Sequence, residues 1–353
     1  MTLSRPVSLA VVGAGYWGAN LIRNFAQIEG CQVTLICETD RTRWDKVRSL
    51  CPGAEFTPSH AAALRSPEID AVVVATPAAS HYALASEALS AGRHVFVEKP
   101  LALSSKECRD LVKLAEARDL RLMVGHTFEY NPAVLKAKRL IDDGELGQIY
   151  YLYSQRLNLG IVRPDINALW NLAPHDVSII RFLLARDPIA VSARGYAYLQ
   201  HGIPDVAFLD LEFESGVAAH IHVSWLDPGK VRRVTVVGDR KMLVYDDVNL
   251  DARIQLYDKG ISPATLNASL GEWSTFGEFQ FIQRAGDLLI PKVDGTEPLA
   301  LECRHFVDCV RDGCRPRTDG ENGWRVVRVL EAADISLREG GRRVSLDELG
   351  SGL

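Results

Sequence analysis

The chain has 353 residues, of which 47% are apolar and 24% charged, and its formal net charge is −5. This length suits two globular domains with full cores, and the negative charge argues against nucleic-acid binding as the main function. No stretch approaches the roughly 20 apolar residues of a membrane helix, and the N-terminus lacks the apolar core of a signal peptide, so we expect a cytoplasmic protein with no membrane partner.

The seven cysteines are scattered along the chain, and their odd number is typical of reduced thiols. The sequence has no Cys-x-x-Cys motif and no Cys/His cluster with zinc spacing, so we expect no metal site. The cysteines are Cys31, Cys37, Cys51, Cys108, Cys303, Cys309 and Cys314.

A glycine-rich turn follows the first apolar segment. Val7–Val12 predicts a buried strand, and a G-x-G-x-x-G pattern leads from it into a helix expected over residues 20–27. In this setting the glycines permit a tight turn and close approach of the backbone to a pyrophosphate, which the helix N-terminus attracts. The predicted cofactor contacts in this loop are Gly13, Gly15, Tyr16, Trp17 and Gly18.

A second strand, over residues 33–37, ends in carboxylates that could hold a cofactor ribose. Glu38 follows Gly18 by 20 residues, which is the expected spacing, and Asp40 is the second candidate. A carboxylate here would repel a 2′-phosphate, so the sequence favours NAD over NADP. The neighbouring Arg41, itself a candidate contact, and Arg43 weaken that preference, and a solvated loop carboxylate is the alternative interpretation.

Apolar segments at 71–75, 95–97 and 121–125 alternate with expected helices. Such alternation predicts a parallel, doubly wound sheet with right-handed crossovers. The turn after residue 75 adds three candidate cofactor contacts, although a helix-capping role for the histidine is an equal alternative. These residues are Thr76, Pro77 and His81.

The strand at 95–97 ends in Glu98, Lys99 and Pro100. In an open α/β sheet this is the edge where ligands bind. A lysine held there beside a carboxylate can be fixed in position and have its pKa tuned. Glu98 and Lys99 are therefore candidate cofactor contacts, whereas the alternative is a surface ion pair that caps the strand.

Four motifs in order, GAGYWG, ATPAASH, EKPL and GHTFEYNP, resemble those of the Gfo/Idh/MocA oxidoreductases, and the resemblance covers essentially the whole chain. It implies an α/β protein with an N-terminal Rossmann domain over residues 1–124. A C-terminal α/β domain over 125–353 would carry a large, open, mostly antiparallel sheet, with helices at about 297–337 packing back on the body. The implied chemistry is hydride transfer between a nicotinamide and a carbinol carbon, with Lys99 contacting the reacting hydroxyl.

A helix expected over residues 170–184 places Asn171 and His175 on one face, four residues apart. A histidine there could take the proton of a substrate hydroxyl as general base. The family resemblance implies an Asp-x-x-x-His pair at this place, so Asn171 departs from the pattern. Asparagine can form a hydrogen bond but cannot stabilise an imidazolium by charge, and Asp165 or Asp176 could supply the missing charge.

The segment before this helix is rich in groups that could meet a polar ligand. Arg163 offers a planar fork suited to phosphate or carboxylate. The string NLGIVRPD…LAPHD resembles family members that act on nucleotide-linked amino sugars, such as UDP-N-acetylglucosamine 3-dehydrogenases, although a solvated loop is the alternative. The candidate substrate-binding residues are Tyr130, Asn158, Arg163, Asp165, Asn167 and Asp176.

Strands dominate beyond residue 187, at 190–198, 206–214, 217–225, 232–238 and 241–245. Their period-2 alternation predicts an antiparallel sheet with one polar face. His220 and His222 share that face, but without a third ligand we expect a solvated or interface surface. A free sheet face favours a homo-dimer or homo-tetramer. Residues 258–279 are expected to form a loop over the substrate cleft.

Three functions fit these observations. The first is an NAD(P)-dependent oxidoreductase acting on a secondary hydroxyl, with C3 of a nucleotide-linked sugar as the expected position. The second keeps the fold but acts on a free sugar, cyclitol or antibiotic precursor. The third is a non-catalytic, NAD-binding regulatory protein, for which Asn171 is the favouring feature and against which the intact Lys99 and His175 count.

Overall fold

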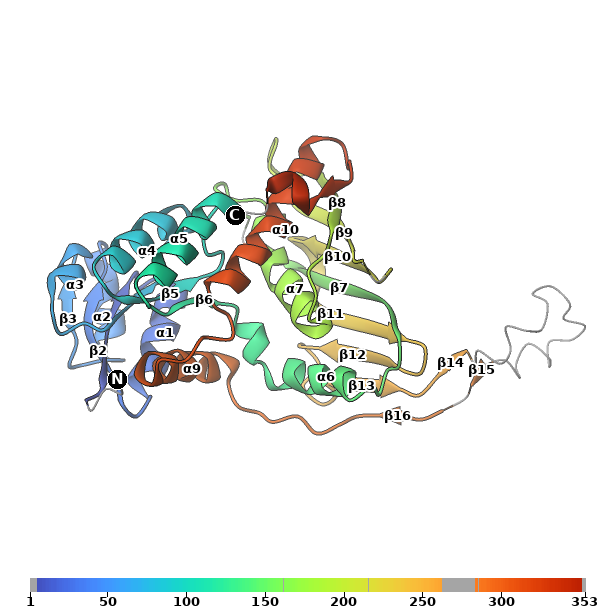
Figure 1. Ribbon diagram of the computed structural model, residues 1–353, viewed down its shortest axis with the longest axis horizontal. Helices are drawn as coiled ribbons and strands as arrows, with labels where there is room; N and C mark the ends of the chain where they lie inside the picture. Colours follow the sequence, from blue (N-terminus) through green and yellow to red (C-terminus); the bar gives the residue numbers. More distant parts are fainter. Residues whose placement is uncertain (1–4, 161, 215, 262–282, 285, 351–353) are drawn as a thin grey trace, which may run out of the picture. The chain divides into compact units, whose positions relative to one another are not determined.

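The computed structural model describes residues 5–160, 162–214, 216–261, 283–284 and 286–350 (Figure 1). They form two compact units, of which the first contains the chain up to Tyr130 together with Thr296–Glu331. The second contains Asn131–Gly295 and Ala332–Leu349. The sequence-based division after residue 124 assigned residues 125–130 and 296–331 to the second domain, whereas their contacts group them with the first.

The first unit is built on a six-stranded sheet in the order β3-β2-β1-β4-β5-β6, and all its neighbouring strands are parallel. From β1 the next strands of the chain, β2 and β3, are added on one side of the sheet, whereas β4, β5 and β6 are added on the other side. The strand order therefore reverses between β1 and β4. Ligands of open α/β sheets bind beyond the carboxyl ends of the strands at such a switch point. The strands are β1 (Val7–Val12), β2 (Cys31–Cys37), β3 (Glu55–Thr57), β4 (Ala71–Val74), β5 (His94–Glu98) and β6 (Leu122–Gly125).

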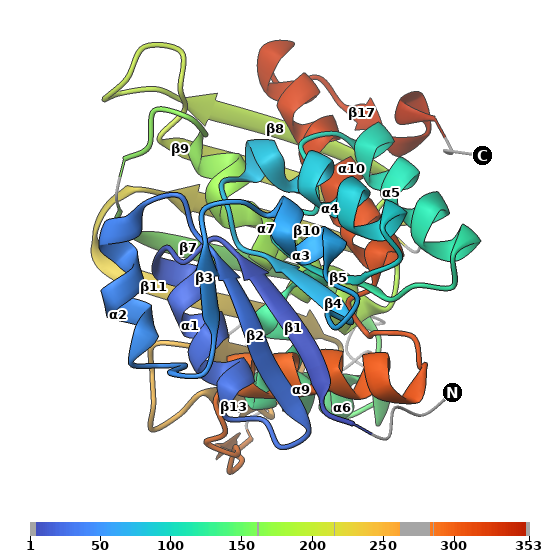
Figure 2. The ribbon, with the colours of Figure 1, turned by 90° about the vertical axis from the view of Figure 1, so that its left-hand side faces the viewer.

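Helices cover both faces of this sheet (Figure 2). On one face, Phe25, Phe96 and Phe306 pack edge to face, with ring centroids 5.6 to 6.2 Å apart. These rings join α1, β5 and α9 into one core. The helices of this unit are α1 (Tyr16–Ala26), α2 (Trp44–Arg48), α3 (Ala61–Arg65), α4 (His81–Ser90), α5 (Ser105–Ala117) and α9 (Pro298–Asp312), with short 3-10 helices η1 (Arg41–Arg43), η2 (Ala78–Ser80) and η3 (Thr127–Tyr130).

The second unit is built on a nine-stranded sheet in the order β16-β13-β12-β11-β7-β10-β9-β8-β17. Its pairs are antiparallel except β7 with β10, which is parallel. The strands are β7 (Ile149–Leu159), β8 (Ala190–Tyr196), β9 (Val206–Glu212), β10 (Ala218–Ser224), β11 (Leu226–Gly238), β12 (Met242–Asp246), β13 (Ile254–Tyr257), β16 (Leu288–Leu289) and β17 (Val344–Ser345), and β14 (Gly260–Ile261) pairs separately with β15 (Gln283–Arg284).

One face of the nine-stranded sheet is packed against helices and the other is open. Along β7 the side chains of Leu152 and Arg156 are buried, whereas Tyr151 and Tyr153 are exposed and stack with centroids 6.4 Å apart. The predicted fold class, a Rossmann sheet plus a mostly antiparallel α/β domain, is therefore confirmed. The remaining helices are α6 (Pro132–Asp142), α7 (Ala168–Leu184), the 3-10 helix η5 (Leu346–Leu349) and α10 (Gly320–Arg338), whose residues belong partly to each unit.

The longest strand differs from its predicted bounds. β11 begins at Leu226 rather than at residue 232, and its register against β7 shifts between Leu226 and Val231. Pro228 and Gly229 lie in this irregular part, and because they interrupt the alternation of side chains they conceal the strand in the sequence. Most of the loop predicted at 258–279 lies outside the described residues. In the described part of the chain, no helix has the length and apolar character required to cross a membrane.

Candidate cofactor and substrate sites

The glycine loop between β1 and α1 has two glycines that cannot be replaced without a clash. Gly13 has φ +97°, and a Cβ atom on it would lie 2.7 Å from the carbonyl oxygen of Ala75. A Cβ atom on Gly18 would lie 2.0 Å from the Gly13 carbonyl oxygen. Gly15 is the N-cap of α1, and no side chain caps the first amides of that helix. These uncapped N–H groups can therefore donate hydrogen bonds to an anionic ligand such as a pyrophosphate.

The two aromatic residues of the loop begin α1 and are exposed, Tyr16 by 79% and Trp17 by 46%. Their rings pack edge to face, with centroids 5.6 Å apart. An exposed aromatic pair beside uncapped helix amides can flank a planar or charged ligand. Both predicted contacts thus lie at the surface of the first unit.

Glu38 braces the glycine loop from the end of β2. The backbone N–H of Ala14 donates to its Oε2 at 2.8 Å, and the N–H of Asp40 donates to its Oε1 at 2.9 Å. Burial alone would raise the pKa of Glu38, but these amides and the charge of Arg43 lower it. The buried carboxylate is therefore ionised and holds the loop in shape, which leaves Asp40 as the more exposed carboxylate.

Arg43, which was not predicted as a cofactor contact, lies beside both carboxylates. Its Nη1 lies 3.5 Å from Glu38 Oε2, its Nε lies 3.2 Å from Asp40 Oδ2, and it is the side chain nearest to a Cβ built on Gly15. The predicted Arg41 instead lies over the ring of Trp44, 5.4 Å from its centroid. The signal for Arg43 is its i, i+3 spacing from Asp40, because residues three apart eclipse in a 3-10 turn.

His81 connects the turns after β4 and β5. Its Nδ1 lies 2.7 Å from the Pro100 carbonyl oxygen and its Nε2 lies 2.9 Å from the Thr76 carbonyl oxygen. Burial, with the charge of Lys99, lowers the pKa of His81, so the ring is neutral and donates to one of these oxygens at a time. The imidazole is thus used to align two loops rather than presented to a ligand.

Lys99 follows the last residue of β5 and is half-buried. Its backbone N–H donates to Glu98 Oε2 at 3.3 Å. The Glu98 carboxyl group faces Gly125 on β6, where a Cβ atom would approach it to 3.3 Å. Burial raises the pKa of Glu98 to about 7, although the charge of Lys99 opposes this shift. The predicted catalytic lysine therefore lies next to a carboxyl group that exchanges its proton near neutral pH.

A second buried carboxyl group belongs to the same surroundings. Glu302 on α9 accepts a hydrogen bond from the Thr127 hydroxyl at 2.6 Å and is fully buried. Burial, with the charges of Glu98 and Glu129, raises its pKa well above the usual range. No local pattern indicates Glu302, because it lies about 200 positions after Glu98 and has no motif around it.

Tyr130, a predicted substrate contact, lies in the interior of the first unit. It is 3% exposed, its hydroxyl lies 3.2 Å from the Thr318 hydroxyl, and the Arg317 guanidinium is 4.8 Å from its ring centroid. Burial raises its pKa. These contacts give Tyr130 a packing role and do not present it to a substrate.

In the second unit, α7 carries the candidate general base. Asn171 and His175 share one face of the helix and are both half-buried, whereas the residues from Asp176 to Ile180 are buried. The N-terminal half of α7 thus has a partly accessible face that includes both side chains. Asn167 has a different role from the one predicted, since it is the N-cap of α7 and accepts the Trp170 N–H at 3.0 Å.

Arg163 and Asp165 form a two-pronged ion pair in the loop before α7. Nε and Nη2 of the arginine lie 2.9 and 2.6 Å from the two carboxylate oxygens. Both side chains are exposed, by 41% and 54%. The guanidinium fork that was expected to meet a phosphate is therefore already filled by a carboxylate of the same loop.

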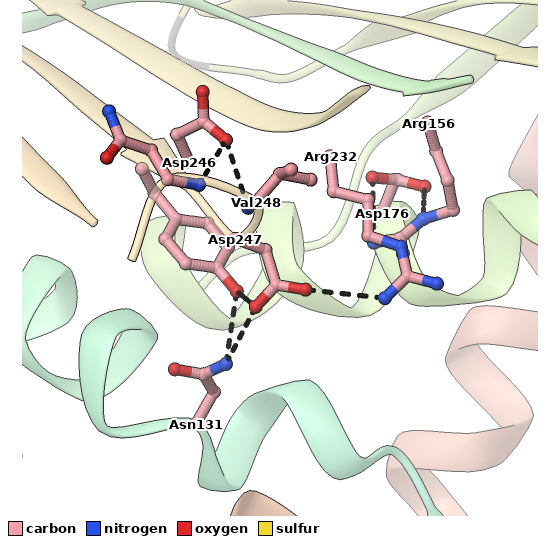
Figure 3. A network of polar contacts seen from close by, with 9 residues as sticks. Asn131, Arg156, Asp176, Arg232, Asp246, Asp247 and Val248 are labelled. Atoms are coloured by element: carbon pink, nitrogen blue, oxygen red, sulfur yellow. Dashed lines mark hydrogen bonds and ion pairs between the residues drawn. The ribbon is translucent and has the colours of Figure 1, made fainter. Parts of the chain in front are cut away.

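Asp176 is buried in an ion pair with Arg156, as Figure 3 shows. Arg156 Nε donates to it at 2.7 Å and the Ser154 hydroxyl at 2.5 Å, and Asp176 is only 1% exposed. Its carboxylate is used inside the second unit, so it is not among the groups offered to a ligand. Asn158 follows Arg156 by two residues on β7 and therefore projects from the helix-covered face of the sheet.

The same unit contains a second, partly buried polar network (Figure 3). The Asn131 amide donates to the Tyr245 hydroxyl at 3.1 Å, and that hydroxyl donates to Asp247 at 2.9 Å. Arg232 lies 3.4 Å from the same carboxylate. Within the described residues, no group of three or more His, Cys, Asp or Glu side chains is arranged to hold a metal ion.

Two family descriptions match this chain. Residues 7–126 match the oxidoreductase family with an NAD-binding Rossmann fold, and residues 134–244 match the GFO/IDH/MocA C-terminal domain. The first match includes all six strands of the parallel sheet, and the second includes β7 through β11. Both descriptions refer to one family.

Curated relatives include two inositol dehydrogenases. The chain is 30% identical to inositol 2-dehydrogenase 2 of Saccharopolyspora erythraea, over 62% of this chain and 66% of that protein. It is 26% identical to scyllo-inositol 2-dehydrogenase (NAD(+)) of Bacillus subtilis, over 96% of each chain. The chain thus spans just under two thirds of the first relative and nearly all of the second.

Solved structures of similar fold include the following three. An oxidoreductase from Magnetospirillum magnetotacticum is 32% identical, with a TM-score of 0.78 and 93% of this chain and 99% of that chain covered. GenD2 from gentamicin A biosynthesis, in complex with NAD, is 27% identical, with a TM-score of 0.80 and 98% and 97% covered. A UDP-N-acetylglucosamine 3-dehydrogenase from Acidithiobacillus ferrooxidans is 23% identical, with a TM-score of 0.76 and 94% and 97% covered, and this likeness concerns the fold.

Proposed function

Because the chain belongs to the Gfo/Idh/MocA oxidoreductase family, we propose that it is an NAD-dependent dehydrogenase acting on a secondary hydroxyl group of a sugar or cyclitol. The observation that carries this proposal is the end of β5, where Lys99 adjoins a carboxyl group with a pKa of about 7. Groups that titrate near neutral pH at the ligand-binding edge of a sheet suit proton transfer.

The first unit has the features that an NAD molecule requires. The uncapped amides of α1 can bind the pyrophosphate, and Gly15 leaves room for it because it carries no side chain. Asp40 is the more exposed of the two carboxylates after β2 and can accept hydrogen bonds from a ribose. NAD, when bound, supplies the nicotinamide that takes or returns the hydride.

Lys99 and His175 are the proposed catalytic residues. The Lys99 ammonium would donate a hydrogen bond to the substrate oxygen and stabilise the negative charge that develops on it. His175 would remove the hydroxyl proton, and Asn171, on the same helix face, would orient a substrate hydroxyl or the imidazole by a neutral hydrogen bond. Glu98 would hold or release a proton beside the lysine.

For the substrate we propose a free cyclitol or sugar first. The named relatives at 30% and 26% identity are inositol dehydrogenases, and neither acts on a nucleotide by name. A nucleotide-linked sugar, the substrate predicted from the sequence, is the second candidate, favoured by the exposed Arg163 in the loop before α7. The Arg163–Asp165 pair would have to open before that arginine could bind a phosphate.

A substrate panel separates these candidates. The purified chain is mixed with NAD and with myo-inositol, scyllo-inositol, common aldoses or UDP-N-acetylglucosamine, and NADH formation is followed by fluorescence. We expect turnover with at least one free polyol and a kcat/KM at least about tenfold lower with the UDP-sugar. The reverse order would support the nucleotide-linked candidate, and the absence of turnover in both directions with every compound would refute the dehydrogenase proposal.

We also propose that the chain forms a homo-dimer or homo-tetramer through the open face of the nine-stranded sheet. Aromatic side chains gather on that face, where the Phe208 and His222 rings stack with centroids 4.4 Å apart. Tyr151, Tyr153 and Tyr196 are each at least 37% exposed. A large exposed aromatic surface of this kind is typical of a protein interface.

A further inference from the structure

Two cysteines lie side by side at the end of α9. The sulfur atoms of Cys309 and Cys314 are 3.1 Å apart, and the Cys314 thiol donates a hydrogen bond to Cys309. Cys309 is fully buried in the last turn of the helix, whereas Cys314 is exposed. Gly313 ends the helix with φ +72° and returns the chain toward it. The sulfurs of a disulfide are about 2.05 Å apart, so a bond needs an approach of only about 1 Å.

Of the other five cysteines, four are buried and Cys31 is half-buried, so Cys314 is the thiol that is most accessible to a dissolved oxidant. Accessible thiols are the ones that oxidise first, and a neighbouring thiol then resolves the product. The pair therefore has the two parts of a thiol–disulfide site, which are an exposed entry cysteine and a resolving cysteine beside it.

His305 supplies a base for the buried member of the pair. Its Nε2 accepts the backbone N–H of Arg317 at 3.0 Å, so this nitrogen is the unprotonated one, and it lies 3.5 Å from the Cys309 sulfur. Its single lone pair takes the Cys309 proton only when the Arg317 hydrogen bond is released. Burial, with the charge of Arg317, lowers the pKa of His305 and keeps the ring neutral. Burial raises the pKa of the Cys309 thiol, so a neighbouring acceptor for its proton is required. Arg121, which donates to the Gly313 carbonyl at 2.7 Å, adds a positive charge that favours the thiolate.

We propose that Cys314, Cys309 and His305 form a peroxide-reactive site that makes a reversible disulfide. The Cys314 sulfur attacks one oxygen of hydrogen peroxide, the O–O bond breaks, and one water and a sulfenic acid result. Cys309 then loses its proton to His305 and its sulfur attacks Cys314, from which the hydroxyl group leaves and takes up that proton as a second water. Two thiols and one peroxide thus give one disulfide and two waters.

The bond would close a loop at the base of a segment that supports the cofactor-binding unit. In that segment the Thr318 carbonyl accepts the N–H of Val124 at 2.7 Å, and the Thr318 hydroxyl donates to the Val124 carbonyl at 2.7 Å. Arg317 donates to the Glu129 carbonyl at 2.8 Å. Residues 315–319 thereby hold the end of β6 and the η3 turn, and the disulfide is expected to raise the melting temperature by a few degrees.

Peptide mapping tests the proposal on the full chain. The reduced protein is treated with hydrogen peroxide, denatured, alkylated and digested with trypsin. We expect two fewer alkylated thiols than the seven of the sequence, and a peptide of residues 305–311 linked by a disulfide to residues 312–317. The linked peptide is expected to persist in Cys31→Ser, a matched control at a half-buried thiol, and to disappear in Cys314→Ser, where an exposed side chain is changed without disturbing the core.

The base is tested separately, by trapping the sulfenic acid with dimedone. In His305→Phe we expect dimedone to label Cys314 and the linked peptide to form at least about fivefold more slowly than in the wild type. The proposal is overturned if wild-type Cys314 accumulates as sulfinic acid while Cys309 stays fully alkylated. It is equally overturned if the disulfide forms at the same rate in His305→Phe.

Discussion

The Glu98 carboxyl group lies in surroundings that oppose its ionisation. It is buried at the end of β5, and its pKa is about 7 because burial outweighs the charge of Lys99. An unfolded glutamate ionises near pH 4.5, so the folded chain binds more protons between about pH 4.5 and 7. The contribution of Glu98 to the free energy of unfolding is therefore highest below that window and falls as the pH rises through it.

Glu98→Gln tests this linkage. In the wild type, the ionisation of Glu98 should lower the free energy of unfolding by about 3 kcal/mol between pH 4.5 and 7, because each unit of pKa shift corresponds to about 1.36 kcal/mol. The glutamine amide stays neutral, so we expect this decrease to be absent in the variant. Urea unfolding at a series of pH values measures the free energy of unfolding of each protein, with Glu116→Gln on the exposed face of α5 as the control. An unchanged pH dependence in Glu98→Gln would show that the carboxyl group ionises normally in the folded chain.

Several residues were identified from the sequence by type but not by partner. The sequence indicates that Tyr130, Asn167 and Asp176 are polar groups near functional motifs. It does not show that the Tyr130 hydroxyl forms a hydrogen bond with Thr318, which lies 188 positions later. Nor does it show that Asp176 forms an ion pair with Arg156, which lies 20 positions earlier. Such partners are fixed by tertiary packing, so a local pattern cannot distinguish a buried polar residue from a ligand contact.

The turn between β1 and α1 shows which glycines an element requires. We expect Gly18→Ala to bind NAD at least about tenfold more weakly and to lose a few kcal/mol of stability, because its Cβ atom would lie 2.0 Å from a backbone oxygen. Isothermal titration calorimetry and urea unfolding measure the two effects. Gly53→Ala is the control, since nothing lies within 4 Å of its Cβ position. Equal affinity in Gly18→Ala and Gly53→Ala would contradict the loop assignment.

The face of α7 that carries Asn171 and His175 makes a second prediction. Asn171→Asp would place a carboxylate four residues before the histidine and favour the imidazolium. The acid limb of the kcat/KM profile should then move to higher pH by roughly half a unit or more. Asn171→Ser, which adds no charge, should leave that limb in place. If the aspartate variant is active with an unshifted limb, His175 is not the general base.

The order of strands and helices in the first unit could be predicted because alternating apolar runs and glycine turns are local features. Helices were also predicted at about 297–337, where α9 lies, but the place of α9 in the first unit was not. Phe25 and Phe96 meet Phe306 across more than 200 residues of chain, and no sequence period encodes such a contact. At the scale of the whole chain, composition and the alternation of apolar and polar residues predict the two sheets. Which unit a distant helix joins is decided by tertiary packing.

The open sheet face makes a prediction about assembly. By light scattering we expect a mass of two or four times 38.9 kDa for the wild type, and a shift toward one copy in Tyr153→Glu, which places a charge in the aromatic surface. Tyr150→Glu should keep the wild-type mass, because Tyr150 is exposed but points to the opposite side of β7 from Tyr153. A wild-type mass of 38.9 kDa at every concentration would rule out this interface.

The most direct test of the proposed chemistry compares Lys99→Met with Lys106→Met, an exposed lysine on α5, in NADH formation from the best polyol of the panel. We predict a kcat/KM at least about 10²-fold lower for Lys99→Met, with the Kd for NAD changed by less than about threefold, and wild-type values for Lys106→Met. Turnover by Lys99→Met at the wild-type rate would contradict the assignment of Lys99 as the residue that stabilises the reacting oxygen.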